Sequence, residues 1–99
     1  MNEQAVELLI VEGRPSIRGE CDLANATQVA SWLDTFDGGP VELDLSGVTF
    51  LDSSGLHVLL NLRRRNPAMR VTAASRIVLR VLEVTGTKDY LMPGHSNGA

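Results

Sequence analysis

The middle of the chain predicts a strand that runs directly into a helix. Apolar and acidic residues alternate at the start of residues 41–51, which is typical of a half-buried strand, and Ser46-Gly47 is interpreted as a break in it. Asp52 and Ser53 follow, and both are residue types that begin helices. Leucine and valine then recur at helical spacing over residues 56–62. Strand, turn and helix start are therefore all predicted within one segment.

The predicted helix has an apolar face and a polar face. When each residue is advanced by roughly 100°, the polar face carries Ser54, His57, Asn61 and Arg65. Ser54 is therefore predicted to face solvent. Ser53 occupies an N-cap position, where its side-chain oxygen can accept hydrogen bonds from the free amides of the first turn. The two serines thus have different predicted roles.

The other segments predict a hairpin followed by alternating helices and strands. In chain order they are a strand at 8–11, a turn at 13–15, a strand at 16–19, a helix at 26–33 stopped by 38–40, a strand at 69–73, a helix capped by Ser75 and closed by Gly86, a short last strand at 90–92, and a loose tail at 93–99. This order predicts a single α/β domain over residues 1–99. Its sheet is mixed, later strands are parallel through right-handed crossovers, and the helices lie mainly on one face.

In open sheets of this kind the functional crevice lies beyond the carboxyl ends of the strands. Asp22 follows the second predicted strand and Ser54 follows the third, so the two residues are expected in neighbouring loops. An exposed hydroxyl at a helix start can be phosphorylated without refolding, because free amides and the helix dipole tolerate a new charge of about −1.5 to −2. The alternative is purely structural: capping by Asp52 and Ser53, with Gly55 allowing close packing.

Several short motifs carry a resemblance to a known family. Asp44-Leu45-Ser46 precedes the run from Asp52 to Leu56, which reads Asp-Ser-Ser-Gly-Leu, and Gly19-Glu20-Cys21-Asp22 comes earlier in the chain. Together with Val84-Thr85-Gly86 near the end, they resemble the STAS domain of bacterial anti-sigma factor antagonists over residues 8–92. A departure is the short segment after Met92, where many such antagonists have a further amphipathic helix.

The resemblance implies a switch controlled by phosphorylation. Ser54 would be the phosphoacceptor, and the partner-binding residues would be Asp22, Asp52, Ser53, Gly55 and His57. The implied partners are an anti-sigma factor that is an ATP-using serine kinase and a serine phosphatase that acts on phosphorylated Ser54. Similar small STAS proteins also serve as accessory subunits of lipid-transport ABC systems. A constitutive scaffold of that type is the alternative function.

Enzymatic readings find less support in the residues. Ser54, His57 and Asp52 are the types used by hydrolases, but the Gly-x-Ser-x-Gly elbow is absent, and so are glycine-rich phosphate-binding loops. The chain is therefore expected to have no catalytic residues and no cofactor. The single cysteine, Cys21, and the separated His57 and His95 predict no metal site, and Cys21 is expected to be a small packed residue.

Composition adds limits on partners and location. A length of 99 residues with 43% hydrophobic content supports one domain, and a net charge of −3 with a pI near 5.2 argues against nucleic acid as a partner. No apolar stretch approaches the roughly 20 residues of a membrane span, and residues 1–4 lack the features of a signal peptide, so a cytoplasmic location without membrane insertion is expected. The run Arg63–Arg65 is either a solvated helix end or an acid-binding patch.

Overall fold

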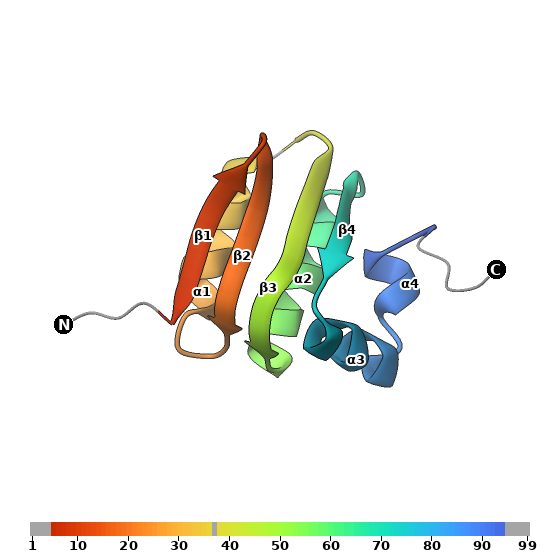
Figure 1. Cartoon of the computed structure of the whole chain (residues 1–99). Helices are drawn as coiled ribbons and strands as arrows, with labels where there is room; N and C mark the ends of the chain where they lie inside the picture. The colour runs from red at the N-terminus through yellow and green to blue at the C-terminus, as the bar shows by residue number, and fades with distance from the viewer. Residues whose placement is uncertain (1–4, 37, 95–99) are drawn as a thin grey trace.

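The computed structural model describes residues 5–36 and 38–94, and within them a four-stranded sheet carries helices mainly on one face (Figure 1). The elements in order are β1 Val6–Val11, β2 Arg14–Cys21, α1 Ala26–Leu33, the short 3-10 helix η1 Asp34–Phe36, β3 Val41–Leu51, α2 Ser53–Arg65, β4 Met69–Ala74, α3 Arg76–Thr85 and α4 Lys88–Leu91. This arrangement confirms the predicted α/β class. Of the predicted tail, residues 95–99 lie outside the described part of the chain, as do residues 1–4.

The sheet has the strand order β1-β2-β3-β4. β1 and β2 pair antiparallel, whereas β2 with β3 and β3 with β4 pair parallel, so the predicted mixed sheet is confirmed. Glu12 and Gly13 connect the hairpin with φ values of 53° and 79°. A two-residue turn with positive φ at both positions matches the twist of paired strands. The turn therefore precedes the predicted one, and Arg14 and Pro15 belong to β2.

The predicted break at Ser46-Gly47 is wrong, because β3 continues through both residues to Leu51. Its pairing with β2 continues as well, with register shifts that absorb the irregularity. Gly47 serves this pairing: a Cβ atom there would lie 2.7 Å from Cγ of Arg18. The glycine thus marks a close approach of a neighbouring side chain instead of the end of a strand.

The predicted last strand at 90–92 is also wrong, because α4 occupies Lys88–Leu91. Leu91 and Met92 are both buried beside β4 and α2, so their apolar side chains complete the core. The preceding helix α3 behaves as predicted. The hydroxyl of Ser75 accepts a hydrogen bond from the amide of Val78, and Gly86 ends the helix in the left-handed conformation.

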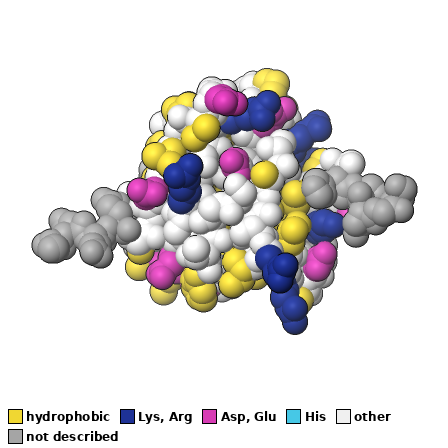
Figure 2. Space-filling model, viewed as in Figure 1, with side chains coloured by type: hydrophobic (Ala, Val, Ile, Leu, Met, Phe, Trp, Pro, Cys, Tyr) yellow, Lys and Arg dark blue, Asp and Glu magenta, His cyan; other side chains and the backbone are white. Residues whose placement is uncertain are grey.

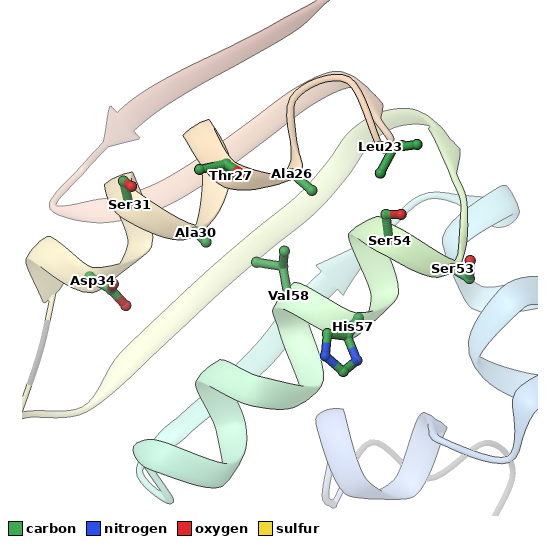
Figure 3. Close-up of a pocket in the computed structure, with 10 residues that line it drawn as sticks. All are labelled: Leu23, Ala26, Thr27, Ala30, Ser31, Asp34, Ser53, Ser54, His57 and Val58. Atoms are coloured by element: carbon green, nitrogen blue, oxygen red, sulfur yellow. The ribbon is translucent and has the colours of Figure 1, made fainter.

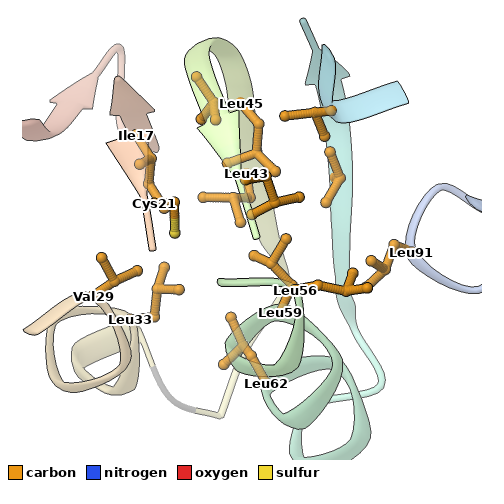
Figure 4. Packing of buried hydrophobic residues seen from close by; sticks show 14 of the residues in the cluster. Ile17, Cys21, Val29, Leu33, Leu43, Leu45, Leu56, Leu59, Leu62 and Leu91 are labelled. Carbon is orange, nitrogen blue, oxygen red and sulfur yellow. The ribbon is translucent and has the colours of Figure 1, made fainter. Parts of the chain in front are cut away.

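The core lies between the sheet and the helices α1 and α2 (Figure 4). Buried side chains from the sheet and from both helices meet there, among them Ile17, Leu43, Val29, Leu33, Leu56, Leu59 and Leu62. Figure 2 shows charged and polar side chains on the opposite face of the sheet. Arg14 and Glu42 form an ion pair of 3.0 Å there, and hydrogen bonds from Ser46 lower the pKa of Asp44. A sheet face with these polar side chains can lie against solvent.

Candidate functional site

The first turn of α2 is capped by Asp52. One carboxylate oxygen, Oδ1, accepts hydrogen bonds from the amides of Ser54 at 2.9 Å and Gly55 at 3.0 Å. The prediction that Ser53 caps this helix is therefore wrong: Ser53 is already the first helical residue, whereas Asp52 has an extended backbone. A carboxylate is also favoured over a hydroxyl at this position because it is charged and faces the positive end of the helix dipole.

With Asp52 as the cap, the hydroxyls of Ser53 and Ser54 are not needed to bond the first-turn amides. Ser53 is exposed and Ser54 is half-buried, and neither hydroxyl bonds to another residue in the described ranges 5–36 and 38–94. The predicted solvent exposure of Ser54 is thus only partial. The side chain of Ser54 projects from α2 toward the loop that carries Leu23 (Figure 3). Its hydroxyl remains accessible at the rim of a groove.

Asp52 also joins α2 to the loop between β2 and α1. Its second carboxylate oxygen accepts a hydrogen bond from the amide of Leu23 at 3.2 Å, and its own amide donates to the carbonyl of Cys21 at 3.3 Å. The predicted proximity of the two loops is confirmed. Within the first loop, Asp22 accepts a hydrogen bond from the amide of Ala24 at 3.0 Å. Since α1 begins at Ala26, Asp22 stabilises the loop and does not cap the helix.

Gly55 holds α2 close to the end of β2. The residue is buried, and a Cβ atom there would lie 2.6 Å from the carbonyl oxygen of Cys21 and 2.7 Å from Cδ1 of Leu51. The distance to the carbonyl oxygen is shorter than real Cβ atoms show, so a side chain at this position would force the backbone to shift. Gly55 therefore belongs to the site through packing, and its burial offers no support for the predicted contact with a partner.

Cys21 lies beneath the site and is 2% exposed, as expected of a small packed residue. Burial, together with the negative charges of Asp52 and Asp22, raises the pKa of its thiol to about 11. The thiol therefore stays protonated at neutral pH. It is a poor nucleophile in the folded protein.

A groove between α1 and α2 opens next to Ser54 (Figure 3). Its volume is ≈ 630 Å³, and its lining consists of Leu23, Ala26, Thr27, Ala30, Ser31, Asp34, Ser53, Ser54, His57 and Val58. His57 is exposed on its rim. In the described part of the chain, no hydrogen bond joins His57 to Ser54 or to Asp52, whose oxygens bind backbone amides. A Ser-His-Asp arrangement for hydrolysis is therefore not assembled.

Two parts of this surface were missed by the sequence analysis. Leu23 is 76% exposed, and α1 contributes the polar Thr27 and Ser31 to the groove. An exposed leucine directly after Asp22, and the polar face of residues 26–33, were the available signals. The arginine run is largely engaged internally: Arg63 donates to the carbonyls of Tyr90 and Pro67, and Arg65 pairs with Asp34 at 2.8 Å.

The described residues contain neither a metal-binding cluster nor a membrane-spanning helix. Across 5–36 and 38–94, no group of three or more His, Cys, Asp or Glu side chains could hold a metal ion. Within these ranges, no helix has the length and apolar character needed to cross a membrane.

Known proteins share this fold and resemble this chain in sequence. The chain belongs to the STAS domain family, since a family model described as "Mlab, STAS domain" matches residues 11–93. Among curated proteins, an anti-sigma-B factor antagonist of Listeria monocytogenes is 29% identical over 93 residues, covering 83% of this chain and 82% of the relative. A protein of the same description from Listeria innocua matches equally well.

Solved structures agree with this assignment. An anti-sigma factor antagonist from Mycobacterium paratuberculosis superposes with a TM-score of 0.74 at 26% identity, covering 89% of this chain and 83% of the other. The anti-sigma factor antagonist SpoIIAA in its unphosphorylated form gives a TM-score of 0.66 at 25% identity, covering 89% and 86%. These relatives and structural neighbours are therefore anti-sigma factor antagonists that match this chain over most of their length.

Proposed function

We propose that this STAS domain is an anti-sigma factor antagonist that binds its anti-sigma factor while Ser54 is unmodified and releases it when Ser54 is phosphorylated. The observation that carries the proposal is the free hydroxyl of Ser54 at the start of α2, where Asp52 has taken over the capping. The names of the relatives and structural neighbours support the general role. The phosphoacceptor role of Ser54 rests on the motif and on this geometry.

The proposed binding surface joins the start of α2 to the loop between β2 and α1. Asp22, Ser53 and His57 provide polar groups, while Leu23 is an apolar side chain that a partner would bury. Gly55 and Asp52 support this surface from below through packing and hydrogen bonds. A partner bound here would cover the hydroxyl of Ser54.

Phosphorylation would then act by charge. A phosphoryl group adds about −1.5 to −2 charge, which the positive end of the α2 dipole tolerates. The same charge in an interface fitted to a neutral hydroxyl brings a desolvation cost on binding, and any acidic group that the partner places beside Ser54 would repel it. We propose that the anti-sigma factor is itself the serine kinase and that a serine phosphatase restores the binding form. This chain then acts as a regulatory binding protein and needs no catalytic residue of its own.

The proposal is tested by measuring the affinity of the anti-sigma factor for wild type, Ser54→Glu and Ile77→Glu. Ile77 is the second residue of α3, as Ser54 is of α2, and it is 41% exposed. Ser54→Glu should weaken binding at least about tenfold without lowering the melting temperature, since an acid near a helix start is favourable by about 0.3–1 kcal/mol. Ile77→Glu should leave binding unchanged.

The accessory subunit of a lipid-transport ABC system is the second candidate, and it uses the same domain without modification of Ser54. Binding of wild type to the ATPase subunit of such a system, with no affinity for any anti-sigma factor, would favour this candidate. Equal loss of anti-sigma binding in Ser54→Glu and Ile77→Glu would mean that added charge acts at long range and not at the Ser54 surface.

A further inference from the structure

β1 is an edge strand of the sheet: one of its two sides pairs with β2, and the other side faces away from the sheet. In an antiparallel pair, residues alternate between those that bond to the neighbour and those whose N–H and C=O groups point away from it. The amide of Glu20 donates to the carbonyl of Ala5 at 2.7 Å, which fixes this alternation. Glu7, Leu9 and Val11 then bond to β2. Val6, Leu8 and Ile10 direct their backbone groups outward.

Two further observations agree with this assignment. Pro15 lies opposite Ile10 and has no N–H group. In this alternation the residue opposite Ile10 donates no hydrogen bond to β1, so a proline is tolerated there. Val11 and Arg14 flank the two-residue turn and form the closing pair of the hairpin. Within the described residues, no backbone hydrogen bond outside the strands uses Val6, Leu8 or Ile10. The outer side of β1 is thus an unpaired edge with respect to residues 5–36 and 38–94.

The sequence of this edge lacks the usual protection against pairing. Proteins commonly prevent pairing at a sheet edge with lysine, proline, a bulge or an element that covers the edge strand. β1 reads Val-Glu-Leu-Leu-Ile-Val, pairs with β2 in an unbroken register and exposes Ile10 at 61%. The opposite edge differs, because α4 lies beside β4 (Figure 1) and β4 carries the exposed Arg70. The β4 edge is therefore partly covered, whereas the β1 edge can accept another strand.

We propose that two copies of this chain pair antiparallel through their β1 strands and form one continuous sheet across a twofold axis. With Leu8 opposite Leu8 of the second copy, Val6 lies opposite Ile10, and each such pair exchanges two backbone hydrogen bonds. Every outward backbone group of these residues then has a partner. The groove of ≈ 520 Å³ beside this edge, lined by Val6, Glu7, Leu8, Leu9 and Gln28, receives the added strand.

The side chains of β1 are compatible with pairing to a second copy of β1. Glu7 is the one charged residue of β1, and in this register it lies opposite Leu9 of the second copy, so like charges do not face each other. The exposed side chain of Ile10 packs beside Val6 of the second copy. The candidate functional site contains no residue of β1, and pairing leaves the start of α2 available to a different partner. Dimerisation through β1 is therefore independent of partner binding at the start of α2.

Sedimentation of the full chain over a range of concentrations tests the proposal, together with amide hydrogen exchange of β1. Wild type should associate to a dimer, and the amides of Leu8 and Ile10 should become protected as the dimer forms. Ile10→Pro should raise the dimer dissociation constant at least about tenfold, because it removes an outward N–H that β2 does not use. Ile10→Lys, which keeps the strand backbone, should weaken the dimer as well if Ile10→Pro fails to fold.

Val84→Lys is the matched control, since Val84 is also a large exposed apolar residue, at 77%, but lies on α3. It should leave the dimer intact. A wild-type monomer at all accessible concentrations would overturn the proposal, and so would a dimer in which Leu8 and Ile10 amides exchange as fast as in the monomer. Equal dissociation by Val84→Lys and Ile10→Lys would show a different, apolar contact and would also overturn it.

Discussion

The first turns of α2 and α3 are both capped by a side chain, but the serines at the two helix starts make different hydrogen bonds. Both helices follow parallel strands, and both have a side chain that caps the first turn. At α3 the hydroxyl of Ser75 is itself the cap and accepts from the amide of Val78 at 3.3 Å. At α2 the carboxylate of Asp52 caps, and the hydroxyl of Ser54 makes no hydrogen bond to any residue in 5–36 and 38–94. At α2, the acid two residues before Ser54 thus takes the capping role that a serine hydroxyl has at α3.

Residues at the start of α2 have different roles. Asp52 binds amides of its own helix and the amide of Leu23, so it fixes both loops of the site. Gly55 sets how closely the helix approaches the carbonyl of Cys21. These residues should affect stability, whereas Ser54 should affect regulation. Substitutions at these positions should therefore separate effects on folding from effects on partner binding.

Gly55→Ala should destabilise the fold by about 3 kcal/mol, because the new methyl group meets a backbone oxygen and a buried side chain that cannot both withdraw. Urea denaturation of the purified variant measures the loss. Gly39→Ala is the control: no atom lies within 4 Å of a Cβ placed there, and its stability should stay within about 0.5 kcal/mol of wild type. Similar behaviour of the two variants would show that α2 can move away from β2 freely.

Asp52→Ala should cost about 1–2 kcal/mol of unfolding free energy, since two first-turn amides and the amide of Leu23 lose their acceptor. Asp52→Asn keeps an acceptor oxygen and should recover more than half of that loss. Chemical denaturation of both variants under identical conditions gives the comparison. If asparagine is no better than alanine, the charge of the carboxylate outweighs its geometry as a cap.

Ser75→Ala should destabilise the protein by about 1 kcal/mol through loss of the α3 cap, whereas Ser54→Ala should change stability by less than about 0.5 kcal/mol. Thermal and urea unfolding of both variants provide the measurement. An equal loss in the two would mean that the hydroxyl of Ser54 also supports its helix, and the contrast between the two helix starts would then fail.

Much of the fold was predictable because hydrophobic spacing is strong in this chain. The alternation in residues 41–45 and the helical stripe in 56–62 gave β3 and α2. The wrong predictions concern segments whose secondary structure depends on packing against residues distant in the sequence. Gly47 suggested a break because glycine weakens strands, but a side chain of β2 approaches it. The last apolar residues, 90–92, suggested a strand, but burial against the core favours the short helix α4.

The candidate site was predictable in its location and less so in its details. Strand order alone brought Asp22 and Ser54 into neighbouring loops, because parallel strands end at the same edge of the sheet. The choice of cap was wrong because Asp52 and Ser53 are both good capping residues, and only the backbone conformation separates them. The half-burial of Ser54 depends on how α1 packs beside α2, which the periodicity of one helix does not contain.

The most direct test of the central claim is the intact mass of the protein after incubation with its anti-sigma kinase and ATP. Wild type and Ser53→Ala should each gain one phosphoryl group, and Ser54→Ala should gain none while remaining folded. Ser75→Ala should be modified as wild type is, since its serine only caps α3. Phosphorylation of Ser54→Ala to the same extent as wild type would contradict the account, because the free hydroxyl of Ser54 would then not be the switch.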